Sequence, residues 1–139
     1  MNLSAVLVAI SATVIGLLGS VHLFYTFFSA KFNPRDDAVR LSMQTAYPVL
    51  TRQTTLWRAW LGFNASHSLG ALLFGAVYGY LALWQADFLF RQTRFLLLVG
   101  LLVLLAYVWL AHRYWFRIPQ RGIALATLLY LLAVALNAA

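Results

Sequence analysis

The sequence has no cysteine and very little charge, and each absence narrows what the chain can be. Without cysteine there are no disulfides, no thiolate metal sites and no cysteine nucleophile. Only 9% of the 139 residues are charged and 63% are hydrophobic, whereas roughly 25% of residues are charged in an ordinary soluble domain. Such a chain has too little polar surface to remain in water.

Groups for catalysis are also scarce. No pair of carboxylates is placed for acid and base work, no serine has both a histidine and an acid for a triad, and no glycine-rich phosphate loop occurs. The long apolar stretches contain no carboxylate, which argues against an ion pump. The sequence therefore favours a protein that is not an enzyme, without deciding the question.

What the sequence does have is long apolar stretches, with the charged residues between them. Each stretch reaches the roughly 18 residues that are needed to cross hydrocarbon. We therefore predict an all-α polytopic membrane protein, a single four-transmembrane-helix bundle within residues 1–139. The predicted spans are residues 4–30, 56–84, 94–114 and 120–138.

Basic residues in the connections predict the orientation, because positive charge is retained on the cytoplasmic side. The first connection holds five Lys and Arg residues, the third holds three, the second holds two and the termini hold none. We therefore expect the protein to lie in a bacterial inner membrane, with both termini in the periplasm. The net charge of +7 is scattered at helix ends beside aromatic residues, so we read it as membrane anchoring and expect no nucleic-acid partner.

A short amphipathic helix is predicted at residues 34–47, on the cytoplasmic membrane surface. Asn33 is suited to cap it, Pro34 to occupy its first position, and the two aspartates that follow complement the helix dipole. Val39, Met43, Ala46 and Tyr47 share its apolar face, and Pro48 stops it.

Two histidines stand out inside the spans. His22 precedes Lys31 by nine residues and His67 follows Arg58 by nine, so at about 1.5 Å per residue both lie roughly 13 Å from the cytoplasmic boundary. Residues three, four and seven apart share a helix face. We therefore expect a pocket between the first two spans that opens toward the cytoplasm, and its predicted ligand-binding residues are His22, Tyr25, Thr26, Trp60, Asn64 and His67.

Several readings of these histidines stay open. They are suited to bis-histidine haem ligation or to a copper or zinc ion. A lipophilic ligand such as a quinone or a lipid, held by imidazole and amide hydrogen bonds and stacked on Trp60 or Tyr25, is an equal alternative. The plain structural reading is that they only form hydrogen bonds between helices.

Two further features concern lipids and packing. Lys31, Arg35, Arg52 and Arg58 are candidate contacts for an anionic headgroup at the pocket mouth, although ordinary positive-inside anchoring explains them more simply. The small residues at positions 71, 75 and 79 form a ladder that allows another helix to approach, within the bundle or in a homo-oligomer. The third and fourth spans look like nearly featureless scaffold.

The stretch from Trp57 to Gly70, WRAWLGFNASHSLG, resembles the signature segment of a family of small bacterial four-helix membrane proteins. The end of the first span, from His22 to Asp36, resembles the same family. The resemblance covers roughly the first 80 residues. It implies a bacterial four-helix membrane protein and no established activity.

Three functions remain as hypotheses. The first is an intramembrane His/Asn pocket that binds a lipophilic or redox ligand. The second is a non-catalytic accessory or assembly subunit that packs against a larger membrane complex, with membrane lipids as its other partners. The third is a small enzyme acting on lipid.

Overall fold

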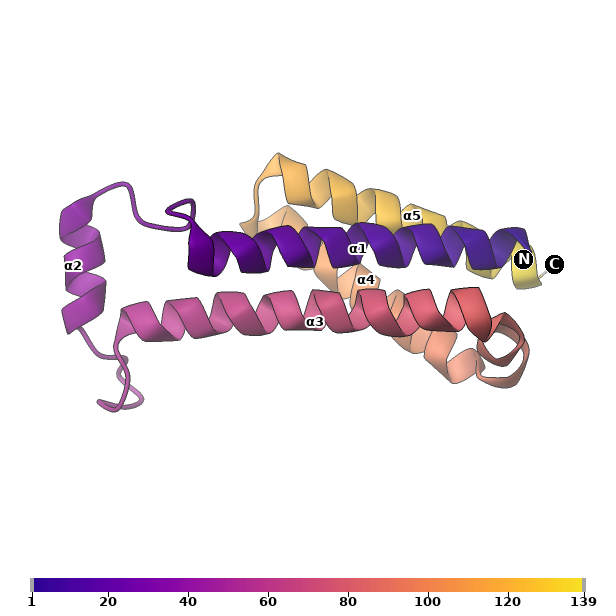
Figure 1. Cartoon of the computed structure of the whole chain (residues 1–139), viewed down its shortest axis with the longest axis horizontal. Coiled ribbons are helices and arrows are strands. Elements are labelled where there is room, and N and C mark those ends of the chain that lie inside the picture. The colour runs from indigo at the N-terminus through magenta and orange to yellow at the C-terminus, as the bar shows by residue number, and fades with distance from the viewer. Residues whose placement is uncertain (1, 139) are drawn as a thin grey trace. The chain divides into compact units, whose positions relative to one another are not determined.

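The computed structural model describes residues 2–138, without the side chain of Ala138. Within that range, four helices are long and apolar enough to cross a membrane. They are α1 (Leu3–Phe28), α3 (Leu56–Trp84), α4 (Arg94–Tyr114) and α5 (Arg117–Ala138) (Figure 1). This confirms the predicted all-α, four-helix membrane fold.

The limits of the spanning helices agree closely with the prediction except at the end of the first span and at the start of the fourth. The first span ends at Phe28 rather than at residue 30, and α5 begins at Arg117 rather than at 120. Pro119 lies in the first turn of α5, where backbone N–H groups have no partner within the helix, so a proline is tolerated there.

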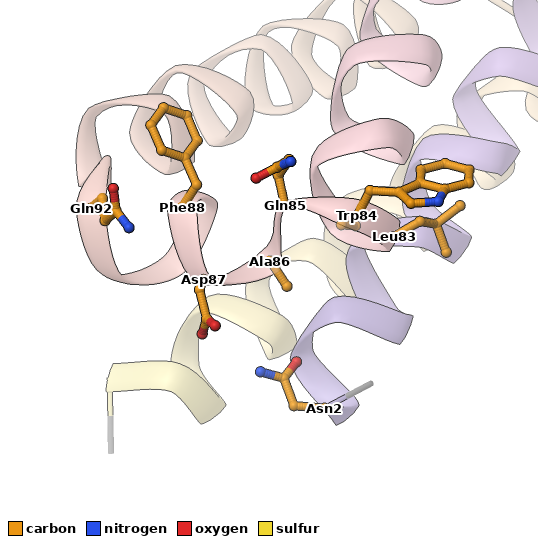
Figure 2. Close-up of a pocket in the computed structure, with 9 residues that line it drawn as sticks. Asn2, Leu83, Trp84, Gln85, Ala86, Asp87, Phe88 and Gln92 are labelled. Carbon is orange, nitrogen blue, oxygen red and sulfur yellow. The ribbon is translucent and has the colours of Figure 1, made fainter.

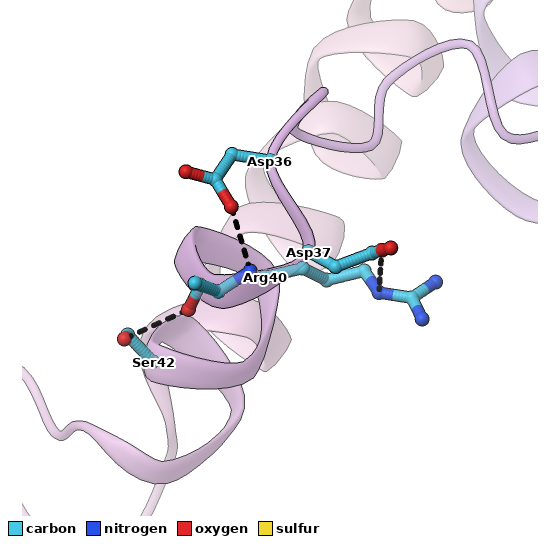
Figure 3. A network of polar contacts seen from close by, with 5 residues as sticks. Asp36, Asp37, Arg40 and Ser42 are labelled. Atoms are coloured by element: carbon cyan, nitrogen blue, oxygen red, sulfur yellow. Dashed lines mark hydrogen bonds and ion pairs between the residues drawn. The ribbon is translucent and has the colours of Figure 1, made fainter.

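The amphipathic helix is present but shorter than predicted. It is α2, Asp37–Thr45, and it begins at neither Asn33 nor Pro34. Asp36 caps it, and its carboxylate accepts a hydrogen bond from Ala38 N at 2.8 Å (Figure 3). Asn33 N instead donates to Ala30 O in the preceding turn. Tyr47 lies beyond the helix end, because a residue before proline disfavours helical geometry.

The chain divides into two compact units. The central unit is Gly19–Gly70, and the terminal unit contains the described residues up to Leu18 and from Ala71 onward. The expectation of one transmembrane domain stays a prediction.

In the terminal unit, α1 and α3 approach each other at glycine. A Cβ atom added to Gly75 would lie 2.9 Å from Gly16 Cα and 3.0 Å from Ala12 O. Gly79 is the next small residue along, and a Cβ there would lie 3.9 Å from Ala12 Cβ. The predicted ladder of small residues therefore serves a contact within the chain.

A tyrosine pair joins α3, α4 and α5 in the same unit. Tyr78 donates to Leu96 O at 2.7 Å and Tyr130 donates to Leu97 O at 3.1 Å. Gly100 makes room for both rings, since a Cβ there would meet the Tyr130 hydroxyl and lie 2.7 Å from the Tyr78 ring. Tyr130 is fully buried, so the expectation that the last two spans are featureless was wrong.

The contact at Gly75 makes a matched test possible on one helix. Replacing Gly75 by Ala places a methyl group against backbone atoms that cannot move aside, and we expect a destabilisation of about 1–3 kcal/mol. Gly62→Ala is the control, because a Cβ there meets nothing within 4 Å, and it should be neutral or stabilise by up to about 1 kcal/mol. Thermal unfolding in detergent, followed by tryptophan fluorescence, measures both. Equal stability of the two variants would contradict the glycine contact.

Candidate functional site

The polar residues of the central unit gather where the end of α1 meets the start of α3. His22 Nε2 lies 3.0 Å from Asn64 Oδ1, and the His22 and His67 rings meet edge to face with their centroids 5.3 Å apart. Both imidazoles are half-buried. The antiparallel course of α1 and α3 puts these residues at one level, as their equal distances from Lys31 and Arg58 predicted.

Asn64 is held at both ends of its amide group. Its Oδ1 faces His22 Nε2, and its Nδ2 donates to Trp60 O at 2.8 Å one turn earlier in α3. Ser68 is fully buried and donates to Asn64 O at 2.9 Å. The position of the side-chain amide relative to the imidazole is therefore set by two contacts, one at Oδ1 and one at Nδ2.

Phe32 is a member of this cluster that the sequence analysis did not include. Its ring packs on His22 with 4.4 Å between centroids, and on Tyr25 with 6.2 Å. Its carbonyl accepts a hydrogen bond from Trp60 Nε1 at 3.3 Å. Phe32 thus lies on the side of His22 where an open pocket mouth was expected. Pro34 disfavours helical geometry at Asn33 and so indicates a turn in this segment, but it carries no signal for the contact between Phe32 and His22.

The remaining predicted residues have different surroundings. Thr26 is buried, but its hydroxyl donates to His22 O at 2.8 Å, so its hydrogen bond is made within its own helix. Lys31 Nζ lies 5.0 Å from the centroid of the Tyr25 ring, within cation–π range. Arg35, Arg52 and Arg58 are exposed, and in the described range they form no ion pair. The ligand-binding roles stay predictions.

Haem does not fit between the two histidines. Their separation of 5.3 Å is ordinary aromatic contact, which leaves no space between the rings for a porphyrin. Nor is there a larger donor set for a metal ion, because residues 2–138 contain no group of three or more His, Cys, Asp or Glu that could bind one.

A second concave region lies in the terminal unit, beside the short π-helical turn Phe88–Gln92. Figure 2 shows the residues that line it, which are Asn2, Ala82, Leu83, Trp84, Gln85, Ala86, Asp87, Phe88 and Gln92. Its charged group is already paired, since Asp87 lies 3.5 Å from Arg91. Asn2 Oδ1 accepts from Ala5 N at 2.8 Å and so caps α1. Asp87 and Asn2 therefore already have local partners.

No protein-family model matches this sequence, and no curated protein or solved structure is significantly similar to it. The resemblance of the Trp57–Gly70 segment therefore stays a prediction, and the function has to be argued from the cluster itself.

The contact between His22 and Asn64 can be measured by a double-mutant cycle. We expect the variants His22→Ala and Asn64→Ala to show a coupling of about 0.6 kcal/mol and at most about 1.7 kcal/mol, the range of hydrogen bonds between membrane helices. Unfolding in mixed micelles with increasing SDS gives the free energies. Strict additivity of the two substitutions would show that the bond does not stabilise the protein.

Proposed function

We propose that this protein binds a lipophilic ligand with a polar head at the cluster formed by His22, Phe32, Asn64 and His67. The observation that carries the proposal is the surroundings of the His22 ring. It has an aromatic ring packed on it, a second imidazole at its edge and an amide oxygen at Nε2. Such a combination is suited to a flat ring that carries hydrogen-bonding oxygens, as in a quinone.

The chemistry of the donors favours this class of ligand over a metal centre. Neutral imidazole both donates and accepts hydrogen bonds, and it changes role by changing tautomer. The Asn64 amide also offers both a donor and an acceptor. These groups can therefore hydrogen-bond to the carbonyl oxygens of an oxidised ring and to the hydroxyl groups of a reduced one. Two imidazoles alone, by contrast, form an incomplete ligand set for zinc.

Phe32 suggests how such a ligand enters. Its ring occupies the position on His22 that a flat ligand ring would take. Phe32 belongs to the connection after α1, and its carbonyl accepts a hydrogen bond from Trp60 Nε1 at 3.3 Å. A ligand that moves through the adjacent leaflet replaces Phe32 on His22 and keeps the imidazole covered.

Ligand extraction tests this proposal. The protein is purified in mild detergent, extracted with organic solvent and analysed by mass spectrometry, and decylubiquinone is titrated as a defined probe. We expect His22→Ala and His67→Ala to weaken binding about tenfold each through the loss of a hydrogen bond. His112→Ala is the matched control, because His112 is exposed and pairs with Gln120 instead. Equal binding by all three variants would refute the site.

A second candidate function has its own supporting observation. Asn64 uses both ends of its amide on protein groups, as expected if the cluster only fastens helices together. The protein would then be an accessory subunit that packs against a larger membrane complex. Two results together would favour this function over ligand binding. The protein would co-purify with a larger complex and show no absorption from a bound ligand, and the variant Asn64→Leu would lose that complex.

We further propose a bacterial inner-membrane location with both termini in the periplasm. The support is the bias of Lys and Arg toward the first and third connections. Alkaline phosphatase fused after α5 should be active, because it folds only outside the cytoplasm. The same enzyme fused within the α4–α5 connection, at Trp115, should be inactive. The reverse pattern would refute the orientation.

A further inference from the structure

The connection between α2 and α3 forms a closed loop with an apolar tip. Leu56 N, at the first residue of α3, donates to Ala46 O at 3.0 Å and closes the base of the loop. Thr51 N donates to Pro48 O at 3.2 Å and forms the turn at its tip. One backbone hydrogen bond therefore fixes the base of the loop and a second fixes its tip.

The two central residues of the tip turn are Val49 and Leu50. They are 109% and 93% exposed, the highest values among the large hydrophobic side chains that the structure describes. Phe63, on the exposed side of α3, is 75% exposed by comparison. Central turn positions are usually occupied by Gly, Asn, Asp, Ser or Pro. Two adjacent branched apolar residues at such positions indicate contact with something apolar.

The place of the loop limits what that contact is. Its base is bonded to the first residue of a membrane-spanning helix, and Trp57 and Trp60 follow in the first turns, as is typical of the headgroup region. Leu50 is the fourth residue after Ala46, so the tip lies at most about 14 Å from the base. The headgroup region is itself roughly 5–7 Å thick on each side of the bilayer. The tip therefore stays within reach of the membrane surface.

Charge in the loop favours one kind of surface. From Ala46 to the first turn of α3 the sequence contains Arg52 and Arg58 and no acidic residue. Both arginines are exposed, and the ion pairs of the described chain are Arg40 with Asp37 and Arg91 with Asp87. Arginine beside an inserted apolar side chain is suited to the phosphate of an anionic lipid.

We infer that the loop from Tyr47 to Thr55 is a membrane anchor. Val49 and Leu50 insert into the leaflet beside α3, and Arg52 binds the headgroup of an anionic lipid. The inference is independent of the ligand proposed for His22 and His67. Its consequence is that this end of α3 has a fixed depth, set by the anchor as well as by the span.

Because the chain has no cysteine, a single label tests the anchor. The full-length variant Leu50→Cys carries an NBD fluorophore and is reconstituted into phosphatidylcholine vesicles with and without phosphatidylglycerol. Gln44→Cys, on the exposed polar face of α2, is the aqueous control, and Phe63→Cys on α3 is the lipid control. We expect the label at position 50 to be quenched by spin-labelled lipid, as at 63, and to be protected from aqueous iodide, unlike at 44.

The arginine is tested in the same vesicles. With the label at position 50, we expect Arg52→Gln to lower the ratio of membrane-inserted to water-exposed label about fivefold in vesicles that contain phosphatidylglycerol. It should have little effect in phosphatidylcholine alone. An equal effect in both lipids would overturn the headgroup assignment.

Two results would overturn the anchor itself. Iodide quenching at position 50 equal to that at position 44 would place the tip in water. Protection that appears only at high protein-to-lipid ratios would show that a second copy of the chain, rather than lipid, covers Val49 and Leu50.

Discussion

Every polar group that a helix carries into hydrocarbon has to find its hydrogen-bond partner within the protein, because lipid offers none. The backbone meets this constraint by forming helices, and the small hydroxyl side chains meet it locally. Thr13, Thr26, Ser68 and Thr127 each donate to a carbonyl one turn earlier. The buried hydroxyl of Ser11 is the exception among the described residues. Polar residues in the spans are thus mostly satisfied without a second helix.

Larger polar side chains reach farther and join helices together. In the terminal unit, Tyr78 and Tyr130 donate to successive carbonyls of α4 over Gly100. The absence of a side chain at Gly100 allows both rings to approach, just as Gly16 and Gly75 allow α1 to approach α3. Packing of this kind replaces the hydrophobic effect, which gives little attraction between helices in lipid.

The central unit satisfies the same constraint with groups whose hydrogen-bonding role is not fixed. A tyrosine bonded to a backbone carbonyl has one role, whereas His22, Asn64 and His67 can each donate or accept. They are half-buried, and the ring of Phe32 packs on His22. A ligand can therefore take over bonds that the protein otherwise makes with itself. This property distinguishes the cluster from the tyrosine pair and supports the proposed ligand site.

The number, type and approximate limits of the spanning helices followed from the sequence alone, because the length of an apolar run is a local property and the bilayer sets the length required. The pairing of His22 with His67 was also predictable, since antiparallel neighbours at equal distance from the basic residues lie at one depth. The position of Phe32, the cap of α2 at Asp36 and the tyrosine pair over Gly100 were not. Each depends on which side chains meet after the chain turns or the helices pack, and these contacts join residues whose separation in the sequence carries no periodic signal.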